Sequence, residues 1–136
     1  MSDNQVKNRD VMLDPDCFAV VKTDLFVKEV LEIMTKYPFG IACVVNDDGD
    51  LQGVFTDGDM RRLTLHQQKP WSALFVDDIM VHSNAKPLTV SPDGDLEDSI
   101  RLMEKKFIRD LPVVDADGKL LGLLHLHQAI KHLLGI

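Results

Sequence analysis

The architecture of this chain can be read from the stretch Asn46-Asp-Asp-Gly-Asp-Leu-Gln-Gly53, because the same pattern returns as Asp115-Ala-Asp-Gly-Lys-Leu-Leu-Gly122. Each stretch lies between two short apolar runs, and apolar runs joined through Asp-Gly predict a β-hairpin. The glycines of the first stretch are 69 residues from their counterparts in the second. The sequence therefore predicts two hairpins built to one pattern.

The repeat extends well beyond the hairpins. The offset of 69 residues holds without a gap back to Val21 and its counterpart Val90. Nearer the N-terminus, Asp10-Val-Met12 returns as Asp78-Ile-Met80 at an offset of 68, so one residue was gained or lost between the copies. Two diverged copies of one unit thus account for nearly the whole chain.

Each copy consists of an extended segment, a helix, the hairpin and a second helix. The first helix carries apolar residues at helical spacing, which are Val27, Val30, Leu31 and Met34 in one copy and Leu96, Ile100 and Met103 in the other. The second helix carries Met60 and Leu63, or Ala129, Ile130, Leu133 and Leu134. We place the copies at residues 8–66 and 77–134, with residues 67–76 as the connection. Neither helix pair can bury its apolar face alone, so the copies should pack together about a pseudo-twofold axis.

Composition excludes several classes of partner. The 136 residues are 45% hydrophobic and 27% charged, as in a chain that folds around a core. Lys and Arg number 15 against 22 Asp and Glu, giving a formal charge of −7. A net negative surface repels phosphate backbones and anionic lipid, so we expect neither nucleic acid nor membrane as partner.

Apolar runs, the N-terminus and the cysteines bear on the cellular compartment. No apolar run approaches the roughly 18 residues of a membrane span, and the polar start Met1-Ser-Asp-Asn-Gln5 does not resemble a signal peptide. Cys17 and Cys43 form no CxxC pair, so they indicate neither a disulfide framework nor a zinc site. We expect a cytoplasmic protein.

The segment with the clearest chemical potential follows the first hairpin. A strand should end at Phe55 and a helix should begin near Asp57, which places Thr56 at the N-cap and Asp59 three residues later. Thr-x-x-Asp before a helix is the pattern of a capping box, which needs no ligand. The same groups could also bind one, because helix N–H groups with a Thr hydroxyl hold phosphate and a carboxylate accepts bonds from ribose hydroxyls. The sequence leaves both interpretations open.

Two neighbours of this segment could assist a ligand. Gly58 would let it approach the backbone closely, and Arg61, followed by Arg62, would supply cationic donors. Paired arginines on an acidic protein are more often a solvated face, so this assignment also has a structural alternative.

These motifs resemble a known family. Repeats that end a hairpin with Gly-hydrophobic-hydrophobic-Thr-x-x-Asp are similar to a pair of CBS domains, the Bateman module. The stretches Gly53-Val-Phe-Thr-Asp-Gly-Asp-Met-Arg-Arg62 and Leu120-Leu-Gly-Leu-Leu-His-Leu-His127 resemble, more closely, the C-terminal CBS pair of bacterial D-arabinose 5-phosphate isomerases. The resemblance implies an α/β fold of two βαββα units, a cleft between them that binds nucleotides or nucleotide-sugars, and a homodimer formed through the CBS helices.

The resemblance also implies the site residues. Thr56 would contact phosphate and Asp59 the ribose, with Asp57, Gly58 and Arg61 in the same turn. The base pocket would be lined by Val20, Val21 and Lys22 together with Gly40, Ile41 and Ala42. His125 and His127 would line the second cleft, where His125 replaces Thr56 and Gln128 replaces Asp59, so ribose binding there should be weaker.

We therefore expect a free-standing regulatory CBS pair that senses AMP, ATP or a CMP-sugar, with no cofactor beyond that ligand. We expect no isomerase domain beside the repeats, and no catalytic residue is predicted. His125 and His127 could start a metal site if both lay on one strand, but no further ligand lies at a suitable spacing, so no metal is predicted. Two alternatives stay open: a ligand-free dimerisation or docking module, and a separated subunit that regulates a sugar-phosphate isomerase or nucleotide-sugar enzyme in trans.

Overall fold

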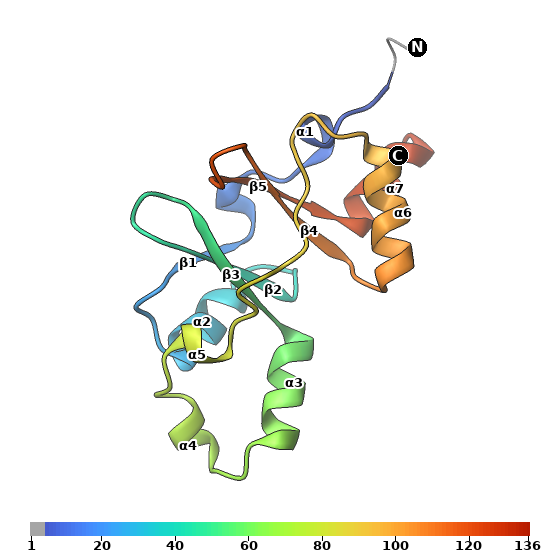
Figure 1. Ribbon diagram of the computed structural model, residues 1–136. Helices are drawn as coiled ribbons and strands as arrows, with labels where there is room; N and C mark the ends of the chain where they lie inside the picture. The colour runs from blue at the N-terminus through green and yellow to red at the C-terminus, as the bar shows by residue number, and fades with distance from the viewer. Residues whose placement is uncertain (1–4) are drawn as a thin grey trace. The chain divides into compact units, whose positions relative to one another are not determined.

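Two β-hairpins, one from each sequence repeat, organise the structure, a computed structural model that describes residues 5–136 (Figure 1). Residues 1–4, with most of the polar stretch used above to argue against a signal peptide, lie outside the described residues. The elements are α1 (Asn8–Val11), the 3₁₀ turn η1 (Pro15–Cys17), β1 (Ala19–Lys22), α2 (Val27–Met34), β2 (Ile41–Val45), β3 (Leu51–Thr56), α3 (Asp57–His66), α4 (Trp71–Leu74), α5 (Ile79–His82), α6 (Leu96–Lys106), β4 (Asp110–Val114), β5 (Leu120–His125) and α7 (Leu126–Leu134).

The elements form two compact units. The first-repeat unit is Asp16–Pro87, and the second-repeat unit joins the chain up to Pro15 with Leu88–Ile136. The short helix α1 therefore belongs to the unit of the second repeat, and α5 to the unit of the first. The predicted boundaries 8–66 and 77–134 follow the sequence repeats, whereas each compact unit contains a short leading helix from the other repeat.

The first-repeat unit is built on a three-stranded sheet in the order β1-β2-β3. The strand β1 runs parallel to β2, because the chain passes through α2 between them, and β2 pairs with β3 as an antiparallel hairpin. With α3 following β3, the order βαββα implied by the family resemblance is present in this repeat.

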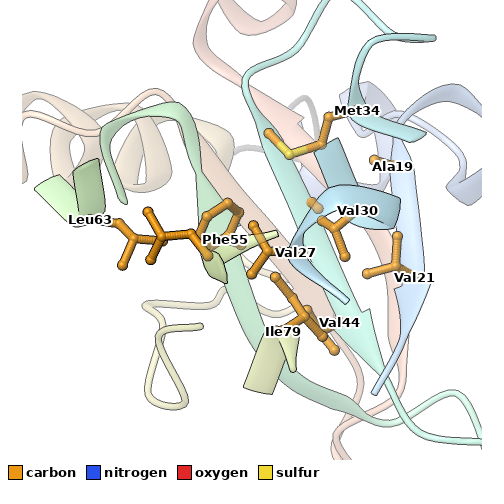
Figure 2. Close-up of a cluster of buried hydrophobic side chains, with 11 residues drawn as sticks. Ala19, Val21, Val27, Val30, Met34, Val44, Phe55, Leu63 and Ile79 are labelled. Atoms are coloured by element: carbon orange, nitrogen blue, oxygen red, sulfur yellow. The ribbon is translucent and has the colours of Figure 1, made fainter. Parts of the chain in front are cut away.

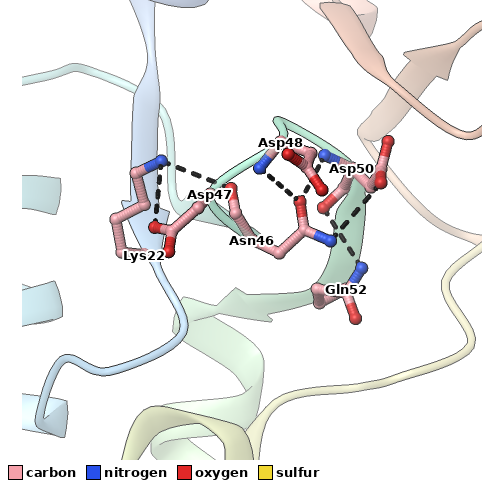
Figure 3. A network of polar contacts seen from close by, with 6 residues as sticks. All are labelled: Lys22, Asn46, Asp47, Asp48, Asp50 and Gln52. Atoms are coloured by element: carbon pink, nitrogen blue, oxygen red, sulfur yellow. Dashed lines mark hydrogen bonds and ion pairs between the residues drawn. The ribbon is translucent and has the colours of Figure 1, made fainter.

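Both predicted hairpins are present, and their turns share one hydrogen-bond pattern. The Asn46 side-chain oxygen accepts bonds from the backbone N–H groups of Asp48 and Asp50 at 3.0 and 2.9 Å (Figure 3). Asp115 does the same in the second hairpin. Gly49 and Gly118 have φ values of 85° and 88°, a conformation that glycine adopts without strain. An Asx side chain at the start and a glycine three residues later therefore explain why the chain reverses at each of these turns.

The core of the first-repeat unit lies between the sheet and its helices. From α2 the side chains of Val27, Val30 and Met34 are buried, as their spacing predicts (Figure 2). They belong to one cluster with residues of the sheet and of α3, α4 and α5, namely Ala19, Val21, Ala42, Val44, Phe55, Leu63, Leu74 and Ile79. Ile79 lies in α5, which is why that short helix belongs to this unit.

The second-repeat unit has a smaller sheet, the β4-β5 hairpin. The extended segment predicted before its first helix forms a single parallel bridge, from Val90 to Val113, in place of a strand. Pro87 and Pro92 flank this segment, and a proline has no N–H to donate to a ladder, so pairing stops after one bridge. Leu96, Met103, Leu111, Val113, Leu124 and Ala129 form the core.

The last helix, α7, buries little of its apolar face. Ala129 is fully buried, but Ile130, Leu133 and Leu134 are 41%, 52% and 67% exposed. In the part of the chain that the structure describes, no helix is both long and apolar enough to cross a membrane.

The connection 67–76 is fixed at its C-terminal end by Asp77. The carboxylate lies 2.8 Å from Nζ of Lys69 and 2.8 Å from Nε2 of His82. The hydrogen bond from Lys69, followed by that from His82, lowers the pKa of Asp77 below its ordinary value of 3.8. The backbone carbonyl of Asp77 also accepts from the N–H of Val27 at 2.9 Å, which joins the connection to α2.

Candidate functional site

The junction between β3 and α3 carries the predicted ligand motif. Thr56 ends β3, where it pairs with Ile41 of β2, and its extended backbone makes it the N-cap of α3. Its hydroxyl accepts a bond from the N–H of Asp59 at 3.1 Å, and the Asp59 carboxylate accepts one from the N–H of Thr56 at 2.9 Å. The predicted capping box is therefore confirmed.

The Asp59 carboxylate has a second partner. Its Oδ1 atom accepts a bond from the guanidinium of Arg62 at 2.8 Å, while Oδ2 serves the cap. The Asp59 side chain is 22% exposed. Each carboxylate oxygen has a further lone pair and the Thr56 hydroxyl keeps its proton, so capping leaves both groups able to bind a ligand. Ligand binding by Thr56 and Asp59 stays a prediction.

Two glycines beside this junction are tightly covered. The carbonyl of Gly40, just before β2, accepts a bond from the N–H of Asp57 at 3.0 Å. A Cβ atom at Gly40 would collide with the Asp57 carboxylate, so this carboxylate lies directly against the Gly40 backbone. A Cβ at Gly58 would come within 3.3 Å of the Arg62 guanidinium, which covers the open side predicted to admit a ligand. Arg61 points to solvent, and no ion pair joins its side chain to another described residue.

The remaining residues predicted for the first site are distributed along the sheet. Ile41 and Ala42 begin β2 beside Thr56 and Phe55 and are buried. Val21 is 3% exposed and belongs to the core of the unit. Val20 is half-buried in the middle of β1, opposite Cys43.

Lys22 lies at the other end of the sheet. It pairs with Val45, the last residue of β2, and its Nζ donates to the Asn46 carbonyl at 3.3 Å, with the Asp47 carboxylate at 3.8 Å (Figure 3). The structure thus brings Gly40, Ile41 and Ala42 to the start of α3 but places Lys22 at the hairpin turn. A ligand contact by Lys22, Val20 or Val21 stays a prediction.

In the second repeat, a different pair of side chains occupies the equivalent junction. His125 is the N-cap of α7 but makes no capping bond. Its Nδ1 lies 2.6 Å from Oδ1 of Asp110, its partner in the strand register, and these side chains are 17% and 14% exposed. Asp110 corresponds to Ile41 at the offset of 69, so an imidazole–carboxylate pair stands where the first repeat has Ile41 and Thr56.

His125 and His127 do not lie together on a strand. The strand β5 ends at His125, and His127 is the second residue of α7, because the chain turns into a helix between them. The condition for the metal hypothesis is therefore not met. In the described residues 5–136, no group of three or more His, Cys, Asp or Glu side chains could hold a metal ion.

A cavity of about 300 Å³ lies in the first-repeat unit beside the start of α3. Its walls come from the end of α2, the loop before β2 and the first residue of α3. They are formed by Leu31, Met34, Thr35, Tyr37, Pro38, Phe39, Gly40 and Asp57. The exposed Asp57 carboxylate carries the only formal charge among these residues.

Two features of these sites were not predicted from the sequence. The first is the pair Asp110–His125, although the offset of 69 from Ile41 and Thr56 contained that information. The second is the place of Tyr37 and Phe39 on a cavity wall, because it depends on how the loop 35–40 folds back against α3.

Comparison with known proteins supplies the family. A family model described as CBS domain matches residues 8–66 and 76–135. The crystal structure of CBSX2 in complex with AMP is 32% identical, with a TM-score of 0.83 over 95% of this chain and 96% of that chain. A second structure of CBSX2, from Arabidopsis thaliana, is 31% identical with a TM-score of 0.82 over 97% and 96% of the two chains.

Arabinose 5-phosphate isomerases are also similar to this chain. The isomerase KdsD of Yersinia pestis is 28% identical over 127 residues, which are 90% of this chain and 36% of that protein. KdsD of Pseudomonas aeruginosa is 33% identical over 99 residues, which are 72% and 29% of the two proteins. The chain spans about a third of the length of the curated relatives that it matches.

Proposed function

Because the chain belongs to the CBS domain family, we propose that it is a regulatory module that senses an adenine nucleotide or a nucleotide-sugar through the first repeat. The family match confirms the tandem CBS fold and the predicted closeness to the isomerase-linked pairs. The observation that carries the proposal is the 32% identity, over nearly the whole of both chains, to CBSX2, which was crystallised with AMP.

The first repeat is proposed as the ligand-binding half because its junction keeps Thr56 and Asp59. A hydroxyl at the start of α3 and a carboxylate with free lone pairs are suited to phosphate and ribose hydroxyls. The second repeat has His125 and Gln128 instead, with the imidazole directed to Asp110. Ligand binding there is expected to be weaker, since Gln128 lacks the charge that strengthens hydrogen bonds to ribose.

In this proposal the chain itself is not catalytic. A ligand would act by binding more tightly to one arrangement of the repeats or protomers than to another, and a partner would sense the change in population. Similarity to KdsD makes a sugar-phosphate isomerase or a nucleotide-sugar enzyme the preferred class of partner, regulated in trans.

A thermal-shift panel with AMP, ADP, ATP, CMP and a CMP-sugar tests the proposal. A ligand at 100 times its dissociation constant adds about 2.7 kcal/mol to the free energy of unfolding, which raises Tm by several degrees. We expect Asp59→Ala to weaken binding by about 1.5–3 kcal/mol and to lower stability by about 1 kcal/mol through loss of the cap.

The matched control is Asp95→Ala. Asp95 is the N-cap of α6, and its carboxylate accepts a bond from the Glu97 N–H at 3.3 Å, so this variant loses a cap in the other unit. It should lose stability and keep nucleotide binding. If Asp59→Ala behaves like this control, the motif is a cap alone, and the alternative of a ligand-free docking module is preferred.

We also propose a homodimer that includes α7. The exposed side chains Ile130, Leu133 and Leu134 form an apolar stripe on that helix, and a second copy would remove it from water. The double variant Ile130→Lys/Leu133→Lys is expected to halve the mass measured by light scattering while circular dichroism stays unchanged. The control Val76→Lys, at an exposed residue of the connection, should leave the mass as it is. A wild-type monomer would contradict this proposal.

A further inference from the structure

We propose that the cavity beside α3 is a second binding site, for a small organic cation in which an ammonium group is attached to an apolar or aromatic body. The cavity is open to solvent and has a volume of about 300 Å³, at the lower end of the range of small-molecule sites. Gly40 and Asp57 are also predicted for the nucleotide site, but the other six lining residues are not. The proposal goes beyond nucleotide sensing, because the proposed ligand carries the opposite charge.

The sign of the ligand's charge follows from Asp57. Its carboxylate lies against the Gly40 backbone at the cavity wall. Among the described residues, no ion pair or hydrogen bond engages this side chain, while the neighbouring Asp59 carboxylate is held by Arg62. Arg61, one turn further along α3, is exposed and forms no ion pair with Asp57. None of the residues that line the cavity is cationic, so within it an anion would face only the Asp57 carboxylate, whereas a cation would be attracted to that carboxylate.

The body of the ligand follows from the other walls. Tyr37 and Phe39 contribute aromatic rings, and Leu31 and Met34 contribute apolar side chains from α2 (Figure 2 shows Met34). An ammonium group gains from an aromatic face as well as from a carboxylate. A ligand with a cationic end and an apolar body satisfies both kinds of wall, whereas an inorganic cation would leave the apolar wall unused.

The second repeat shows that these features are specific to the first. The backbone bond from the Asp57 N–H to the Gly40 carbonyl has its counterpart from Leu126 to Arg109, at 2.8 Å. In that repeat the glycine is thus replaced by a cationic residue and the carboxylate by an apolar one that packs on the core. The two repeats thus have the same backbone hydrogen bond here, but a carboxylate in the first and a guanidinium in the second. The second repeat therefore serves as an internal control for cation binding.

Three probes of similar size and different charge test the proposal on the full chain: phenethylammonium, 2-phenylethanol and phenylacetate. Each is titrated into ¹⁵N-labelled protein and followed by amide chemical shifts. Phenethylammonium is expected to shift the amides of Tyr37, Gly40 and Asp57 saturably, and those of Arg109 and Leu126 little. The alcohol should bind at least about fivefold more weakly, and the anion should not bind.

Asp57→Asn keeps the shape of the side chain and removes its charge, and should weaken phenethylammonium binding at least about fivefold. The control Asp117→Asn removes an exposed carboxylate from the turn of the second hairpin and should leave the affinity for phenethylammonium unchanged. Equal binding of the ammonium and the alcohol, shifts spread over both repeats, or an unchanged affinity in Asp57→Asn would each overturn the proposal. If Asp57→Asn does not fold, the three probes on the wild-type chain decide. No nucleotide is used, so failure here is distinct from failure of nucleotide sensing.

Discussion

Asp77 shows what a single side chain contributes to this fold. Its carboxylate pairs with Lys69 of the connection and with His82 of α5. Its backbone carbonyl accepts a hydrogen bond from the N–H of Val27. One residue therefore joins the connection and α5, its near neighbours in sequence, to the distant helix α2. Since both partners stabilise the ionised carboxylate, the pKa of Asp77 is lowered in the folded chain.

This lowered pKa predicts a pH dependence. A carboxylate whose pKa is lower when folded contributes stability that is fully present above its unfolded pKa and is lost as pH falls through the folded one. The stabilisation by Asp77 should thus be present at neutral pH and decline below the ordinary value of 3.8. Urea unfolding from pH 7 to pH 2.5 should show Asp77→Asn less stable than wild type at pH 7, with the difference shrinking below about pH 4. A difference that is constant over this range would contradict the prediction.

At the scale of elements, α3 and α7 begin at equivalent positions but are stabilised differently. The start of α3 uses Thr56 and Asp59 as reciprocal caps. The start of α7 has no side-chain cap, and His125 instead pairs with Asp110 across the hairpin. The two repeats therefore have the same backbone at this junction but different side chains. Within each repeat, the effects of mutating these side chains on the free energy of unfolding should not be additive.

Exchanging these sets tests that dependence. His125→Thr alone takes the imidazole away from the partly buried Asp110 carboxylate, and should lower the free energy of unfolding by about 1–2 kcal/mol. The triple variant Asp110→Ile/His125→Thr/Gln128→Asp installs the side chains of the first repeat and should be more stable than the single variant. Denaturant titration measures the triple variant and its three single variants. If the triple variant loses at least the sum of its single changes, the sets are not interchangeable.

At the scale of the whole molecule, the compact units do not coincide with the sequence repeats. The N-terminal segment packs in the second-repeat unit, where Asn8 is 1% exposed and binds the hydroxyl of Ser99 at 2.8 Å. Leu13 exchanges backbone bonds of 2.8 and 3.1 Å with Leu123. The beginning of the chain therefore completes a unit whose other residues start at Leu88.

Removing residues 1–15 should consequently destabilise the distant half of the sequence. Amide hydrogen exchange is expected to accelerate in α6, β4 and β5, since the deletion exposes part of their core. Trp71, the only tryptophan, lies in the first-repeat unit and supplies the control, because its fluorescence-detected unfolding should change less. Loss of protection mainly in residues 16–87 would contradict the prediction.

The sequence by itself determined the repeat, both hairpins, the two long helices of each copy and the capping box, because each depends on residues close together in the chain. Asn46 with Gly49, and Thr56 with Asp59, act within a few residues of one another. The offset of 69 then carried each assignment to the second copy.

Only the tertiary structure decided which side chains meet over longer distances. It placed Lys22 at the hairpin turn away from Thr56, paired His125 with Asp110, and brought Asp57 against Gly40 to close one wall of a cavity. It also placed α1 in the unit of the other repeat. These contacts depend on strand register and on the path of the loops, which are set by the packing of the whole core and leave no periodic pattern in the sequence.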